Sequence, residues 1–70
     1  MAEVKSEIAG KIVAVNISVD DTIEDDDEIF LLEVMKMELT VRGGVDGTVK
    51  EILVAVGDTV EEGQTLAVIE

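Results

Sequence analysis

Apolar and polar residues alternate along much of the chain, which is the period-two pattern of a β-strand with one covered face. The clearest example is the segment 37–42, in which apolar residues hold the odd positions. The same alternation runs through residues 15–19, and Ile52, Val54 and Val56 have the same spacing of two. We therefore expect strands in these segments, with their apolar side chains turned toward a core, and we expect no helix.

Turn-forming residues separate these segments at short intervals, as in all-β proteins. The turn signals are Ala9-Gly10, Asp20-Asp21, Gly43-Gly44, Asp46-Gly47, Gly57-Asp58 and Glu62-Gly63. Hydrophobic residues make up 47% of the chain, and Val and Ile, which favour strands, supply most of them. Pattern and composition together predict an all-β fold.

The chain contains an internal repeat, which becomes visible when the sequence is shifted by 37 positions. Residues 2–33 then align without a gap with residues 39–70. The identical pairs are Val4/Val41, Gly10/Gly47, Val19/Val56, Asp21/Asp58, Thr22/Thr59, Glu24/Glu61 and Glu33/Glu70. Eight further pairs exchange one aliphatic residue for another: Ile8/Val45, Ile12/Val49, Val15/Ile52, Ile17/Val54, Ile23/Val60, Ile29/Leu66, Leu31/Val68 and Leu32/Ile69.

Both halves interrupt the alternation at the same place. Ile12 and Val15 lie three positions apart, as do Val49 and Ile52, and a bulge there would return both apolar residues to one face. A four-strand unit is too small to bury its own apolar face, so we expect the two copies to close one core as a flattened barrel or sandwich with a pseudo-twofold axis. Residues 1–70 should then form a single domain, and the unmatched segment 34–38 is where we expect its specific function.

The composition excludes several kinds of chemistry. The chain has 70 residues, a net charge of −12, no His and no Cys. It therefore lacks a disulfide framework, a thiol nucleophile, an imidazole base and a zinc site of the usual ligands. A chain of this length also has no room for a pocket between two domains. We expect a non-catalytic protein without a metal site.

Charge and hydropathy also restrict the partners. So acidic a chain repels phosphate backbones, and Phe30 is its only aromatic residue, so we expect no nucleic-acid partner. No segment approaches the roughly 18 uninterrupted apolar residues of a membrane span, and the N-terminus lacks a basic start followed by an apolar run. We therefore expect no membrane partner and a cytosolic location.

The unmatched segment resembles the tip of a hairpin. Tight two-residue loops need positive φ, which Gly, Asn or Asp supplies easily, but Met35-Lys36 contains none of these. A broken local rule of this kind points to function. The alternative interpretation is that Lys36 is an ordinary solvated lysine and that Met35 and Met37 fill gaps in the core.

Val34-Met35-Lys36-Met37, with Glu33 before it and Glu38 after it, resembles the attachment motif of the biotinyl domains of biotin carboxyl carrier proteins, commonly Ala-Met-Lys-Met. Segments 47–52 and 56–64 also resemble this family, and the likeness covers essentially the whole chain. It implies a barrel-sandwich hybrid of two four-stranded antiparallel sheets. The gap-free repeat leaves no space for the thumb of many bacterial carriers, so the small, free-standing, thumbless type is the most similar.

The resemblance implies that biotin protein ligase joins biotin to the ε-nitrogen of Lys36 through an amide. Met35 and Met37 would be recognised with it, and Val34 and Glu33 complete the motif. The attached biotin would carry carboxylate between the biotin carboxylase and carboxyltransferase sites of an acyl-CoA carboxylase, and the protein would supply placement rather than catalysis.

Two other function classes stay open. Related lipoyl domains usually have Asp-Lys-Ala at this tip, so Met35 and Met37 favour biotin over a lipoyl carrier. A non-carrier interaction module with the same barrel would leave Lys36 unmodified.

Two features depart from the family pattern or from the repeat. Val34 replaces the commoner Ala, which leaves the efficiency of a given ligase open. Asp20 and Asp26 stand where the second half has Gly57 and Gly63, so we expect these two turns to use Asp in the left-handed region and to be looser.

The run 20–28 holds seven carboxylates in nine residues. An EF-hand loop would need a central Gly and flanking helices, which this segment lacks, so we expect a solvated turn rather than a calcium site. A further hypothesis is that these charges steer the chain toward basic surfaces on the ligase or on carboxylase subunits.

Overall fold

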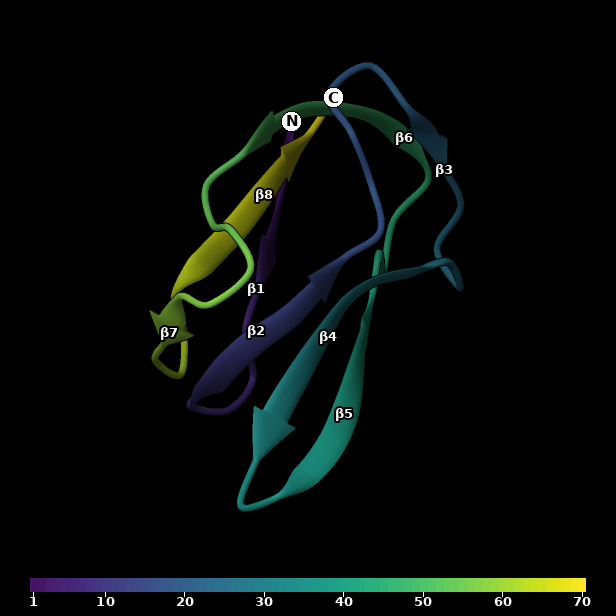
Figure 1. Ribbon diagram of the computed structural model, residues 1–70. Helices are drawn as coiled ribbons and strands as arrows, with labels where there is room; N and C mark the ends of the chain where they lie inside the picture. The colour runs from purple at the N-terminus through teal and green to yellow at the C-terminus, as the bar shows by residue number, and fades with distance from the viewer.

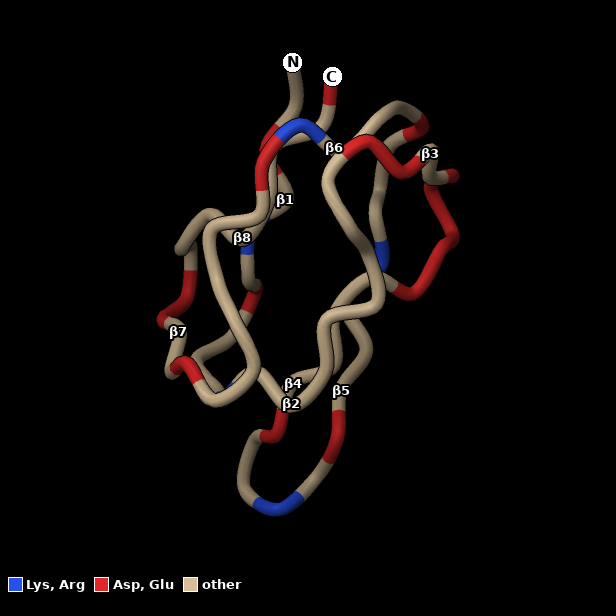
Figure 2. The backbone as a smooth tube through the Cα atoms, turned by 45° about the horizontal axis from the view of Figure 1, so that its top comes forward, with Lys and Arg blue, Asp and Glu red and all other residues tan.

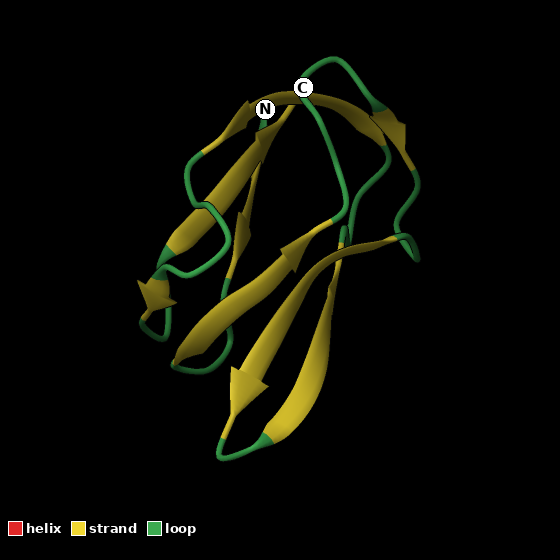
Figure 3. Ribbon diagram, in the orientation of Figure 1, coloured by secondary structure: helices red, strands yellow, loops and turns green.

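The computed structural model describes residues 1–70 and consists of strands and connecting loops (Figure 1; Figure 3). The strands are β1 (Ala2–Lys5), β2 (Gly10–Val15), β3 (Thr22–Ile23), β4 (Glu28–Val34), β5 (Met37–Arg42), β6 (Gly47–Ile52), β7 (Thr59–Val60) and β8 (Thr65–Ile69). They form two four-stranded sheets, ordered β1-β8-β6-β3 and β5-β4-β2-β7, and every pairing is antiparallel. The predicted all-β fold is confirmed, and the chain has no helix long and apolar enough to cross a membrane.

The strand pairing follows the 37-residue repeat, so the two sheets are related by the expected pseudo-twofold axis. Outside the hairpin tip, each pairing has a counterpart in which both residue numbers are raised or lowered by 37. The corresponding pairs are Ile12↔Leu32 and Val49↔Ile69, Leu39↔Leu32 and Ala2↔Ile69, and Gly10↔Val60 and Gly47↔Ile23. Each half therefore contributes strands to both sheets, and the two copies close one structure together.

The predicted bulge is present in both copies. The register of β2 against β4 shifts between Ile12 and Ala14, and that of β6 against β8 shifts between Val49 and Glu51. Ile12 and Val49 are fully buried as a result. The extra residue in each strand thus restores the inward side chains, as the three-residue spacing predicted.

One core of buried apolar side chains fills the space between the sheets. Its members come mostly in pairs related by the repeat: Ile12/Val49, Ile23/Val60, Ile29/Leu66, Phe30/Ala67 and Leu32/Ile69, joined by Val4 and Val54. Val15, Ile17, Val34, Val41, Val45 and Ile52 pack against it while partly exposed. Among these pairs, the two side chains differ most in size at Phe30 and its counterpart Ala67.

Two predicted strands end earlier than their alternation suggested. β2 ends at Val15 and β6 at Ile52, and the residues that follow form turns. In these turns Ser18 N–H donates to Asp21 Oδ2 (2.8 Å) and Ala55 N–H donates to Asp58 Oδ2 (2.9 Å). Val19 and Val56, which were expected to face the core, are exposed. The hydrogen bonds from Asp21 and Asp58 hold these residues in turns, so β2 and β6 end although the apolar pattern continues.

The predicted left-handed conformation is present at Asp20 and absent at Asp26, and the predicted loosening is not found at Asp20. Asp20 has φ +79°, close to that of Gly57, and its turn keeps the hydrogen bonds of the second copy, so it is not looser. Asp26 does not adopt positive φ, whereas Gly63 does. Gly63 N–H donates to Ser6 O, and the first half replaces that bond with one from Gly44 N–H to Asp25 O. The turn has been rebuilt in a conformation that Asp tolerates.

Candidate functional site: the tip of the β4–β5 hairpin

The β4–β5 hairpin protrudes at the end of the barrel opposite the two termini (Figure 1). Val34 lies opposite Met37, so the hairpin closes through a two-residue loop, Met35-Lys36. All five residues predicted for the site, Glu33 to Met37, therefore lie in this one turn and its flanks. The structure places them together because the register of β4 against β5 leaves only two residues to reverse the chain.

The loop has the backbone conformation that two-residue hairpins require. Met35 has φ +51° and Lys36 has φ +67°. For residues other than Gly, this left-handed conformation costs roughly 1 kcal/mol or more each. The predicted hairpin is thus present without the residues that usually form it, and the barrel below must hold it in place.

Close packing beneath the hairpin holds its base. A Cβ atom on Gly10 of β2 would lie 2.8 Å from Val34 Cγ2 and 2.9 Å from Glu33 O. Val34 is partly buried against the core. The backbone of β2 therefore passes directly under the last residues of β4, which is possible because Gly10 has no side chain.

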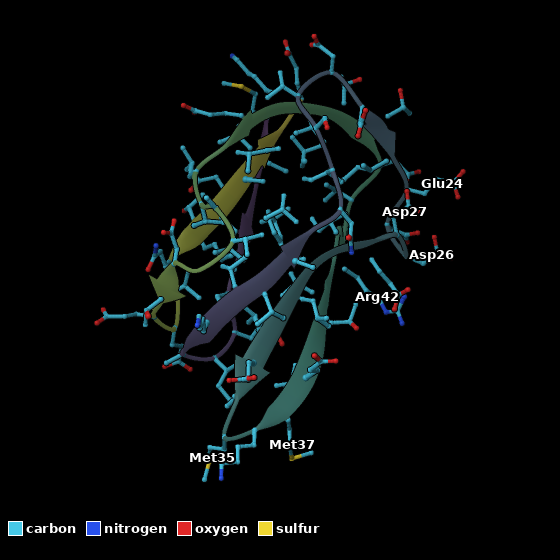
Figure 4. All side chains as sticks on the ribbon, in the orientation of Figure 1. Glu24, Asp26, Asp27, Met35, Met37 and Arg42 are labelled. Atoms are coloured by element: carbon cyan, nitrogen blue, oxygen red, sulfur yellow. The ribbon has the colours of Figure 1, made fainter.

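The loop itself is open to solvent. The Met35 side chain is 91% exposed and that of Met37 is 66% exposed, and both point away from the barrel (Figure 4). Lys36 is exposed and makes no hydrogen bond or salt bridge, since the only salt bridge of the chain joins Arg42 Nη2 to Glu28 Oε1 at 3.8 Å. The interpretation of the two methionines as core residues is therefore wrong.

The charges around Lys36 are acidic. In Figure 2 the basic segment at the tip, which contains Lys36, lies between two acidic ones. These are Glu33 and Glu38, which lie directly opposite each other on β4 and β5. Like charges at such positions, with Cβ atoms about 5 Å apart, destabilise a sheet. The hairpin thus holds an unfavourable pair beside a single free ammonium group.

Lys36 offers one primary amine at the outermost point of the molecule. Lysine amines are protonated near neutral pH, so acylation needs an acyl donor that has already been activated. An external enzyme could reach the amine without moving any other part of the barrel. A long acyl group would fit there, because nothing in the chain covers the tip.

The acidic run lies at a distance from this tip, around β3 and the start of β4 (Figure 2). Carboxylates accept hydrogen bonds from the backbone of the run. Glu24 N–H donates to Asp27 Oδ2 within the run, and Asp25 N–H donates to Asp46 Oδ1 outside it, both at 2.8 Å. Arg42 Nη1 donates to the carbonyl of Asp26 at 2.8 Å (Figure 4). The run forms turns, and no group of three or more carboxylates is placed to hold a metal ion.

Two features of the site were not identified from the sequence. The sequence predicts Gly10 as a turn residue and as part of the repeat, but not as the residue that lets β2 pass under β4. Its match with Gly47 was the available signal, because Gly47 also lies against backbone, at Glu70 O. The opposition of Glu33 and Glu38 is the register that a two-residue loop at Met35-Lys36 implies, so that expected loop was the available signal.

Comparisons with known proteins agree with this geometry. The chain is 44% identical over 70 residues to the "Biotinylated protein TB7.3 homolog" of Mycobacterium leprae, covering 99% of both chains. It is 42% identical over 64 residues to the alpha subunit of methylcrotonoyl-CoA carboxylase of Dictyostelium discoideum, covering 91% of this chain and 9% of that protein. The structure of Kluyveromyces lactis urea carboxylase matches 99% of this chain and 6% of that chain, with a TM-score of 0.91 and 35% identity.

The chain thus spans nearly all of one relative and under a tenth of two large carboxylases. A family model described as "Biotin-requiring enzyme" matches residues 1–69. That match covers both halves of the repeat and the hairpin between them. The chain belongs to this biotin/lipoyl attachment family.

Proposed function

We propose that the chain is a biotin carboxyl carrier in which Lys36 is the attachment residue. The observation that supports this best is the position of Lys36 at the exposed tip of a hairpin, between two exposed methionines. In the attachment step, the Lys36 nitrogen would attack the carbonyl of biotinyl-adenylate held by biotin protein ligase. An amide forms, AMP leaves, and the ammonium proton passes to solvent.

The residues around Lys36 present it to the ligase. The positive φ values of Met35 and Lys36 turn the chain at its outermost point, and Met35 and Met37 offer two apolar side chains for recognition. Val34 anchors the loop to the core, and Glu33 adds a charge on the β4 side. Biotin supplies the ureido nitrogen that takes up carboxylate, and the chain holds that group on a rigid barrel.

We further propose that the chain moves carboxylate between a biotin carboxylase and a carboxyltransferase of an acyl-CoA carboxylase in the cytosol. Tethering on a hairpin raises the effective concentration of the attached group at both partner sites. The relatives include carboxylases that act on different acceptors, so the acceptor is a property of the carboxyltransferase rather than of this barrel.

Intact mass after incubation with biotin protein ligase, ATP and biotin tests the attachment. We expect the mass to increase by one biotinyl group in the wild type and to stay unchanged in Lys36→Arg. Lys11→Arg, another exposed lysine, is the matched control and should be modified like the wild type. Modification of Lys36→Arg would contradict the assignment of this residue.

The same assay separates the alternatives. Incubation with a lipoate ligase should leave the chain unmodified, and modification by that enzyme alone would indicate a lipoyl carrier. A chain that neither ligase modifies would be a non-carrier module.

A further inference from the structure

The β5 edge is the least protected strand edge of the molecule. The sheet orders leave four edge strands, β1, β3, β5 and β7. β3 and β7 have two residues each, and β1 has four with a register shift before Lys5. β5 has six residues, no proline, and one neighbour, β4. Exposed edges of this length pair with other strands unless something covers them.

The register of the hairpin shows which backbone groups of β5 are free. The residues that flank a two-residue loop exchange hydrogen bonds, and the pairs then alternate along the ladder. Val34↔Met37 is therefore a bonded pair, so Glu38 and Thr40 turn their N–H and C=O groups outward. Gly43 N–H donates inward to Asp27 O, so Arg42 next to it also faces outward.

The side chains of β5 complement a second copy of the same strand. If two β5 strands pair antiparallel about Thr40, Glu38 of each copy lies opposite Arg42 of the other. On the inner face, Leu39, which is 39% exposed, lies opposite Val41 of the other copy. One twofold pairing thus places two opposite-charge pairs and two apolar pairs across the edge, and each kind of pair stabilises an antiparallel sheet.

A second observation favours this arrangement. Glu33 has Lys11 of β2 opposite it on one side and Glu38 of β5 on the other, so Glu38, on the edge strand, has only a like charge opposite it. In the paired sheet, Arg42 of the second copy would stand beside Glu38 on the side away from Glu33. It would supply the missing positive charge.

We propose that two copies of this chain associate through their β5 edges into a continuous eight-stranded sheet, with Thr40 on the twofold axis. The interface is isologous, so both copies use the same surface and the assembly closes as a dimer. The strands run in opposite directions, so the two Lys36 loops point away from each other and stay exposed. The inference does not depend on the modification of Lys36.

Sedimentation equilibrium of the unmodified chain tests the dimer. We expect the mass to rise from 7.5 kDa toward twice that value as the chain concentration is raised to about 1 mM. Glu38→Arg and Arg42→Glu each create two like-charge pairs across the interface and should weaken dimerisation about tenfold or more. The double variant restores the opposite-charge pairs in reverse and should dimerise like the wild type.

Lys5→Glu is the matched control. Lys5 occupies the place of Arg42 in the other half, on the β1 edge, and this change alters the net charge by the same amount as Arg42→Glu. It should dimerise nearly as well as the wild type. A wild type that stays at 7.5 kDa, or a double variant that stays monomeric, would overturn the proposal.

NMR on the wild type gives a test that needs no substitution. The amide signals of Glu38, Thr40 and Arg42 should shift with concentration and their hydrogens should exchange more slowly at high concentration. Shifts confined to β1, to the acidic run or to the hairpin loop would show a different contact and contradict pairing through β5.

Discussion

The two residues of the hairpin loop adopt a backbone conformation that this chain otherwise gives mostly to glycine. Gly44, Gly47, Gly57 and Gly63 have positive φ, and Asp20 is the only residue other than glycine, besides the loop pair, that does. Met and Lys gain nothing locally from this conformation, because neither side chain caps the turn. The loop therefore holds these side chains at a cost in stability, which is the pattern expected where binding or modification determines the residue.

Replacing Met35 by glycine should remove part of that cost. We expect Met35→Gly to raise the free energy of unfolding by about 0.5 kcal/mol, because relief of the left-handed strain exceeds the added entropy of the unfolded chain. Urea denaturation measures this. Met37→Gly, in the extended strand next to the loop, is the control and should lower stability by about 1 kcal/mol. A loss of stability in both variants would contradict the strain at Met35.

Substitutions in the Val34–Met37 motif and in the core should differ in their effect on stability, because the motif methionines are exposed and the core residues are buried. Val54 is buried in the core cluster, so Val54→Ala should lower the free energy of unfolding by about 2 kcal/mol. Met37→Ala, at an exposed position, should change it by less than about 0.5 kcal/mol. Changes at the partly buried Val15, Ile17 and Val68 should fall between these values. Equal shifts of the thermal midpoint at Val54 and Met37 would contradict the exposed tip.

At the scale of elements, the repeat predicted more than the alternation did. The repeat predicted the pseudo-twofold axis and a bulge in each half, because equivalent residues of the two halves fill one shared core. Alternation placed strands over 15–19 and 52–56, where caps from Asp21 and Asp58 end them. It also could not show that the apolar face of β5 is only partly covered, since the period of a strand does not reveal what lies above it.

The base of the hairpin depends on Gly10 of β2. Gly10→Ala should lower the free energy of unfolding by about 2 kcal/mol, because its Cβ would collide with Val34 and with the carbonyl of Glu33. We also expect the amide signals of Met35 and Lys36 to shift, since the collision lies under their loop. Urea denaturation and NMR measure the two effects.

Gly47→Ala is the matched control for Gly10. Its Cβ would meet Glu70 O, the counterpart of Glu33 O, and also Ile69 Cγ2, both at the far end of the barrel, and its φ of +157° adds backbone strain to the collision. It should also lower stability but leave the signals of Lys36 unchanged. Equal shifts at Lys36 in both variants would show that the loop responds to general destabilisation rather than to its own support.

For the whole molecule, the net charge of −12 acts against compactness. The only salt bridge has both side chains more than half exposed, so ion pairing compensates little of the repulsion among the carboxylates. At about 0.1 M, salt screens repulsion between exposed charges that lie more than about 10 Å apart, so NaCl should raise the thermal midpoint of unfolding. Asp25→Lys, in the acidic run, should raise the midpoint at low salt and reduce its salt dependence. A midpoint that falls with NaCl would contradict this.

The whole-molecule symmetry has a consequence for the chain ends. Leu39 pairs with Leu32 beside the tip, and the equivalent pair in the second half is Ala2 with Ile69, beside the two termini. The gap between Glu70 and Met1 therefore occupies the position that Val34-Met35-Lys36-Met37 occupies in the first half. If a second Val-Met-Lys-Met joined Glu70 to Met1, the chain would be a closed ring. It would have a Lys-containing hairpin tip at each end of its long axis, which is 31 Å long in this structure. Such a ring should accept two acyl groups per chain, one at each tip.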